Sequence, residues 1–159
     1  VGALTGVATG GRKEEKARGV SLVPGFALLR PAGPEGGEID LVDLPGHGRF
    51  VRAMISGATG MRAVLLAVDA REGIKPQTVE HLEIARLIGV RRGVLALTEC
   101  DLATPEAIAA RSGEIAAAAS RAGIEAGPVI ATSTVTGTGL ADLKAALASL
   151  LDEHGRAHV

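Results

Sequence analysis

The stretch Asp43-Leu44-Pro45-Gly46-His47 follows a short apolar run, Ile39 to Val42, that predicts a β-strand. A carboxylate at the end of a strand lies at the edge of a sheet. The Pro-Gly pair then imposes a turn whose glycine lets a ligand approach the backbone. Asp43 could hold a hydrated Mg²⁺ through water, the Gly46 N–H could meet a phosphate oxygen, and His47 could orient an attacking water. A plain strand, turn and surface histidine explain the pentapeptide about as well, so its context has to decide.

The composition is that of one globular domain with few aromatic residues. Of the 159 residues, 47% are hydrophobic and 22% are charged, and the net charge of −1 indicates no polyanion-binding surface. Phe26 and Phe50 are the only aromatic residues, so we expect a core of Ala, Val, Leu and Ile. Cys100 is the only cysteine, which excludes an internal disulfide. No apolar run approaches the roughly 20 residues that span a bilayer, and no signal-peptide pattern is present, so we expect no membrane partner.

Apolar runs alternate with helical patterns along the chain. Strands are predicted in a segment ending at Leu29 and at 38–43, 63–68, 93–97 and 128–132, and helices over 75–89, 104–123 and 140–150. The first two strands are expected to form a hairpin, Val1–Gly6 to end a helix, and 48–60 to form a loop and a short helix. This order indicates an α/β domain over residues 1–151, with a mostly parallel sheet and helices on both faces, followed by a frayed polar tail at 152–159.

Three polar clusters follow predicted strands directly. They are Asp43 to His47, Thr98 to Asp101 and Ser133 to Gly137. Ligands of parallel α/β sheets bind at the carboxyl ends of the strands. Three such clusters in one chain indicate a ligand site more strongly than any single one of them.

The motifs together resemble those of the translational GTPases, which are P-loop NTPases. The resemblance rests on Glu15–Ser21, Asp43–His47, Gly73–Leu82, Thr98–Asp101 and Ser133–Gly137, in that order, and it covers the chain to about Leu151. Within the family the chain looks most like the G domain of the selenocysteine-specific elongation factors (SelB). Thr98 stands where elongation factor Tu and most relatives have Asn, and the tracts 57–60 and 87–92 are similar as well.

The resemblance implies GTP or GDP as the nucleotide and Mg²⁺ as its metal. Ser21, which keeps the hydroxyl of the family's first-switch threonine, and Asp43 would bind the metal. Gly46 would hydrogen-bond the γ-phosphate, and His47 would position the hydrolytic water.

The same resemblance assigns the remaining site residues to the base. Asp101 would accept hydrogen bonds from the N–H and NH₂ groups of guanine, which adenine does not offer, with Thr98 beside it. Ser133 and Thr134 would supply a backbone contact to guanine O6.

Two departures from the family pattern alter these expectations. Glu99 stands where the family has lysine, so we expect weaker nucleotide binding and predict that Glu99→Lys tightens it. The phosphate-binding loop with its Gly-Lys-Ser/Thr occurs nowhere in these residues, and neither does the strand before it. We therefore interpret the chain as a truncated G domain. We expect residues 1–159 alone to be inactive and poorly soluble, because the absent strand would lie between the strands at 38–43 and 63–68.

The expected function is that of a GTPase module in a cytoplasmic selenocysteine-specific elongation factor. Through the full-length protein it would deliver selenocysteinyl-tRNA to the ribosome. One alternative is another translational GTPase, similar to elongation factor Tu. A second is a nucleotide-free binding module on the same fold, which Glu99 and the missing loop favour and Asp43, Gly46, His47 and Asp101 oppose.

Overall fold

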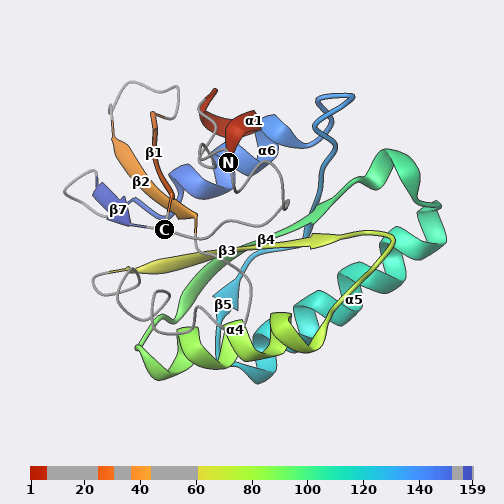
Figure 1. Cartoon of the computed structure of the whole chain (residues 1–159), viewed down its shortest axis with the longest axis horizontal. Helices are drawn as coiled ribbons and strands as arrows, with labels where there is room; N and C mark the ends of the chain where they lie inside the picture. Colours follow the sequence, from red (N-terminus) through yellow and green to blue (C-terminus); the bar gives the residue numbers. More distant parts are fainter. Residues whose placement is uncertain (7–24, 31–36, 44–60, 152–155, 159) are drawn as a thin grey trace, which may run out of the picture.

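Two β-sheets frame the described part of the chain (Figure 1). The computed structural model describes residues 1–6, 25–30, 37–43, 61–151 and 156–158. The expected loop and short helix at 48–60, and the expected site residues Ser21, Gly46 and His47, lie outside these ranges.

The larger sheet is parallel and is centred on β4 (Arg92–Thr98). β3 (Ala63–Asp69) pairs with β4 along its whole length, from Ala63 opposite Arg92 to Asp69 opposite Thr98. β5 (Glu125–Ala126) and β6 (Ile130–Ala131) pair with the other edge of β4, also in parallel. This arrangement confirms the predicted parallel α/β sheet.

The smaller sheet contains the predicted hairpin. β1 (Gly25–Leu29) pairs antiparallel with β2 (Glu38–Asp43), and β7 (Arg156–His158) pairs in parallel with β2. The expectation of a frayed tail is therefore wrong for residues 156–158, because the backbone of β2 offers them hydrogen-bond partners. β2 and β3 are not paired with each other. The poor solubility expected for residues 1–159 stays a prediction.

Helices cover both faces of the larger sheet, as the sequence predicts (Figure 1). α4 (Pro76–Leu87) and α5 (Pro105–Arg121) pack on one face, while the short α1 (Gly2–Thr5) and α6 (Leu140–Ala148) pack on the other. Alternate residues of β4 supply the two cores, since successive strand side chains point to opposite faces. Leu95 and Leu97 belong to the core under α4 and α5. Val94 and Ala96 belong to the core under α6.

The second core also joins the two sheets. Ile39 and Leu41 of β2 are buried in it together with Leu143 and Leu147 of α6. The small sheet is thereby attached to the large one through side chains, although no backbone hydrogen bond of a ladder links β2 to β3. This packing sets Asp43, the last residue of β2, relative to the rest of the domain.

Local sequence signals explain the helix starts. The hydroxyl of Thr104 accepts a hydrogen bond from the Ala107 amide at 3.3 Å, and Pro105 takes the first helical position of α5. α4 also begins at a proline, Pro76. Of its apolar residues, Leu82 is buried, while Val79 remains 42% exposed. None of the described helices is long and apolar enough to cross a membrane.

The short strands were the least predictable elements. The expected strand at 128–132 is reduced to Ile130–Ala131, and the two residues of β5 carry no strand pattern of their own. Both are held by β4, so their pairing comes from tertiary contact and not from local propensity.

Candidate functional site

The carboxyl ends of β3 and β4 form the floor of the candidate site. Asp69 and Thr98 are register partners at these ends. The Thr98 hydroxyl donates to the carbonyl of Val68 at 3.3 Å, and the Ala70 amide donates to the carbonyl of Thr98 at 2.9 Å. Thr98 therefore fixes the point at which the chain leaves the sheet.

The residues after Thr98 make a tight turn that exposes Asp101. Glu99 is the only described non-glycine residue in the left-handed region, at φ 57° and ψ 33°. The one-turn 3₁₀ helix η2 (Cys100–Leu102) follows it, closed by a 3.0 Å hydrogen bond from the Leu102 amide to the Glu99 carbonyl. Asp101 lies on this turn with an exposed side chain that has no hydrogen-bond or ion-pair partner among the described residues. Its carboxylate is thus available to a ligand.

A short hydrogen-bond chain joins this turn to the loop after β6. The Cys100 amide donates to the Thr132 carbonyl at 3.1 Å. The Thr132 amide and hydroxyl both donate to the carbonyl of Leu97, at 2.7 and 3.1 Å. The predicted clusters at 98–101 and 133–137 are therefore brought together, as expected from strand ends at one edge of a sheet.

Ser133 has a structural task in its own loop. It is 2% exposed, and its hydroxyl accepts hydrogen bonds from the amides of Val135 and Thr136 at 3.2 and 3.1 Å. The Ser133 amide donates to the carbonyl of Thr138 at 3.0 Å. These bonds occupy the acceptor positions of the Ser133 hydroxyl, whereas the exposed Thr134 amide donates to no described residue. Thr134 is thus the backbone donor of this loop that a ligand can reach.

Gly139 ends the loop where no larger residue fits. Its φ is +69°, and a Cβ at this position would lie 2.0 Å from the carbonyl oxygen of Ala131. The close approach sets the start of α6 against β6, so the loop between them has a fixed span.

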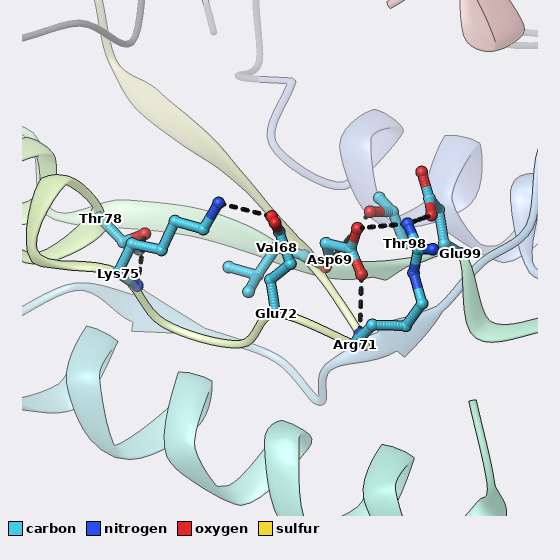
Figure 2. A network of polar contacts seen from close by, with 8 residues as sticks. All are labelled: Val68, Asp69, Arg71, Glu72, Lys75, Thr78, Thr98 and Glu99. Carbon is cyan, nitrogen blue, oxygen red and sulfur yellow. Dashed lines mark hydrogen bonds and ion pairs between the residues drawn. The ribbon is translucent and has the colours of Figure 1, made fainter. Parts of the chain in front are cut away.

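An ionic cluster at the same edge was missed by the sequence reasoning (Figure 2). Arg71 lies between two carboxylates: its Nη2 is 3.2 Å from Asp69 Oδ2, and the same nitrogen is ion-paired with Glu99. The Arg71 amide also donates to Asp69 Oδ1 at 2.7 Å. The hydrogen bond from Arg71 holds the pKa of the Asp69 carboxyl below its usual range. The signal available in the sequence was a charged residue just beyond each of two neighbouring parallel strands.

Asp43 is set apart from these residues by the sheet to which it belongs. It is the last residue of β2, opposite Gly25 of β1, and its side chain is half-buried. Among the described residues, no group of three or more His, Cys, Asp or Glu side chains is arranged to hold a metal ion. A single carboxylate still suits Mg²⁺, which keeps several waters and takes one or two protein carboxylates.

The chain matches a known family model over most of its length. The model is the elongation factor Tu GTP binding domain, and it matches residues 5–153.

Among curated proteins, the chain is similar to the selenocysteine-specific elongation factor of Desulfomicrobium baculatum. The two are 41% identical over 148 residues, covering 93% of this chain and 23% of that protein. It is also 31% identical over 165 residues to the translation initiation factor 2 subunit gamma of Thermococcus kodakarensis, covering 91% of this chain and 40% of that protein. The chain thus spans less than half the length of these relatives.

Solved structures give the same result. A bacterial selenocysteine-specific elongation factor, EF-Sec, superposes with a TM-score of 0.87 at 35% identity, covering 94% of this chain and 25% of the other. The elongation factor SelB from Methanococcus maripaludis, in complex with the GTP analogue GppNHp, gives a TM-score of 0.72 at 28% identity, covering 87% of this chain and 29% of the other.

Proposed function

Because the chain belongs to the family of the elongation factor Tu GTP-binding domain, we propose that it is the GTP-binding and GTP-hydrolysing domain of a selenocysteine-specific elongation factor. In the full-length protein this domain would act in the delivery of selenocysteinyl-tRNA to the ribosome, in the cytoplasm. The similarity to two such factors supports the subfamily. The similarity to an initiation factor 2 gamma subunit favours a second candidate, another translational GTPase.

The observation that carries the proposal is the exposed carboxylate of Asp101 on a turn that is held at two points. Thr98 anchors the turn to the sheet, and the Cys100–Thr132 hydrogen bond anchors it to the neighbouring loop. A carboxylate held in this way can accept two hydrogen bonds from the guanine edge, each worth about 1.5–3 kcal/mol when one partner is charged. The Thr134 amide is the donor that would meet the O6 oxygen of the base. This arrangement opposes the alternative of a nucleotide-free module.

The phosphate side of the site would be formed by residues of the small sheet and by segments outside the described ranges. Asp43 and Ser21 would hold Mg²⁺, which neutralises charge on the phosphate oxygens when bound. Gly46 would donate its amide to the γ-phosphate. His47 would orient the attacking water, so the chain's own contribution is positioning and hydrogen bonding. The family's phosphate-binding loop is not among the 159 residues, and we predict that residues 1–159 alone do not hydrolyse GTP.

Nucleotide selectivity of the full-length protein tests the proposal. We expect GDP to bind far more tightly than ADP, and Asp101→Asn to lower the GDP affinity by at least about tenfold, since one accepting oxygen is replaced by a donor. Asp142→Asn is the matched control, because Asp142 is an exposed aspartate in the first turn of α6. Titration calorimetry measures both affinities. Equal affinities for GDP and ADP in the unchanged protein would overturn the proposal.

A further inference from the structure

We propose that Arg71 is a positioning residue for the turn at 99–102, which carries Asp101. Arg71 connects the turn after β3 to Glu99 and thereby sets the orientation of the Asp101 side chain. This inference rests on the proposed function, because it names a further residue of the same site. Its evidence is the ionic cluster of Asp69, Arg71 and Glu99 (Figure 2).

Arg71 stands on a rigid support. The Gly73 amide donates to the Asp69 carbonyl at 2.8 Å, and the side chain of Asp69 accepts the Arg71 amide at 2.7 Å. Ala70, between them, is 1% exposed and packs in the core. The guanidinium therefore projects from a turn whose backbone is fixed by the sheet, and it can act as a fixed point for what it binds.

The contact with Arg71 stabilises the backbone conformation of Glu99. Its left-handed backbone conformation is disfavoured for an L residue compared with the right-handed region. Asp101 follows it by two residues, so a change at Glu99 re-aims the Asp101 carboxylate. The ion pair with Arg71 joins the Glu99 side chain to β3 and favours the conformation that exposes Asp101.

The charges of the cluster also support a positioning role for Arg71. Asp69, Glu99 and Asp101 place three carboxylates on two adjacent turns, and the guanidinium of Arg71 touches two of them. The side chains of Arg71 and Glu99 are 52% and 46% exposed, so solvent screens their attraction. We therefore expect a moderate effect on affinity, of about three- to fivefold, and a clearer effect on recognition of the base.

The ratio of the affinities for GDP and inosine diphosphate depends on the position of the Asp101 carboxylate and therefore measures it. Hypoxanthine lacks the 2-amino group of guanine, so it removes one of the two donors that Asp101 would accept. A change in general charge or stability lowers the affinity for both nucleotides equally. Misplacement of Asp101 lowers the affinity for GDP more, and the ratio of the two affinities falls.

The experiment compares Arg71→Gln, Glu99→Gln and the double variant in the full-length protein. We expect each single variant to lower the GDP affinity about three- to fivefold and to reduce the ratio of GDP to inosine diphosphate affinity. The double variant should be no worse than Arg71→Gln, because Glu99→Gln removes only a contact that Arg71→Gln also removes. Lys75→Gln is the matched control: Lys75 lies in the same connection and is ion-paired with Glu72 at 2.5 Å, and it has no contact with Glu99.

The outcomes separate this inference from the proposed function. If the unchanged protein prefers GDP over ADP but Arg71→Gln and Glu99→Gln leave the ratio intact, Arg71 does not position the turn. The same conclusion follows if Lys75→Gln lowers the ratio as much as Arg71→Gln. If the unchanged protein does not prefer GDP, the proposed function itself fails. Should Arg71→Gln fold poorly, Glu99→Gln tests the contact from its other side.

Discussion

The amide of Cys100 donates a hydrogen bond to the carbonyl of Thr132 at 3.1 Å, which ties the turn after β4 to the loop after β6. Thr132 in turn donates twice to the carbonyl of Leu97, through its amide and its hydroxyl. The two loops of the base side are thus parts of one hydrogen-bonded unit. Substitutions in this unit should therefore change the position of the Asp101 side chain even where the substituted residue does not contact a ligand.

Thr132→Val tests the contribution of the buried hydroxyl. Thr132 is 3% exposed, and its hydroxyl donates to Leu97 at 3.1 Å. Valine keeps the shape and removes the hydrogen bond, but the Leu97 carbonyl keeps the Thr132 amide as a donor. We expect the free energy of unfolding to fall by about 0.5–1.5 kcal/mol. Thermal or denaturant unfolding measures it, with Thr134→Val as the control, because Thr134 is exposed and its hydroxyl has no hydrogen bond to the described residues. Equal losses in the two variants would contradict the role of Thr132.

Gly139→Ala should be far more damaging than the same change at Gly123. Both glycines have left-handed backbones, with φ of +69° and +71°. A Cβ at Gly123 meets no atom within 4 Å, whereas one at Gly139 would lie 2.0 Å from a backbone oxygen of Ala131. We expect a loss of about 1 kcal/mol for Gly123→Ala and roughly 3 kcal/mol or more for Gly139→Ala. Similar midpoints of unfolding would mean that the loop before α6 relaxes freely.

The fold was largely predictable because its long elements carry unambiguous patterns. The uniformly apolar run at Ala63–Val68 is typical of a strand in a parallel sheet, and Thr104-Pro105 is typical of a helix start; the structure confirms both elements. The strands that were not predicted are β5 and β7, and β6 is shorter than the predicted strand at 128–132; all three are two or three residues long. Such strands form because the edge of β4 or β2 provides hydrogen-bond partners for their backbone. This tertiary pairing leaves no pattern in the local sequence.

The candidate site was predictable in its motifs and not in its contacts. Thr98, Asp101, Ser133 and Thr134 fall at the carboxyl edge of the larger sheet, where the strand order leads one to expect them. The partner of Glu99 could not be deduced, because Arg71 is 28 positions away in sequence. Only the parallel register of β3 and β4 brings their following turns together.

The contact with Arg71 reverses one expectation drawn from the family pattern. The family pattern alone predicts that Glu99→Lys tightens nucleotide binding by restoring the family's lysine. In this chain a lysine at 99 would face the guanidinium of Arg71, and the two cations would repel each other. With this contact taken into account, Glu99→Lys should weaken GDP binding about three- to fivefold in the full-length protein. A titration showing tighter binding would show that the family's lysine arrangement is accessible in spite of Arg71.

The reactivity of Cys100 should depend on pH in a way that reports its surroundings. Burial raises the pKa of the Cys100 thiol, the hydrogen bond from the Thr132 backbone opposes this, and the nearby charges of Asp101 and Asp69 raise it further. A raised pKa means less thiolate at any given pH, so alkylation should be slower than for a free thiol and should keep rising at alkaline pH.

Asp101→Asn removes one of those negative charges and should shift the alkylation profile of Cys100 to lower pH. Iodoacetamide labelling followed by mass spectrometry measures the rate across the pH range. Asp142→Asn, on α6, is the control that should leave the profile unchanged. A profile identical to that of a small free thiol would show that Cys100 is not shielded in the way described.

His47→Ala should separate the chemical step from nucleotide binding. The resemblance gives His47 the task of orienting the attacking water, and the residue lies outside the described ranges. A group that acts on the water contributes mainly to the transition state, so its loss lowers the turnover rate and leaves the affinity for GTP nearly unchanged. We expect single-turnover hydrolysis in the full-length protein to slow by at least about tenfold, toward the factor of about 10²–10⁴ that a positioned acid or base provides. His81→Ala, on the half-buried side of α4, is the matched control, and it should change neither quantity. A hydrolysis rate within about twofold of the unchanged protein, with GTP still bound, would assign the positioning of the water to another group.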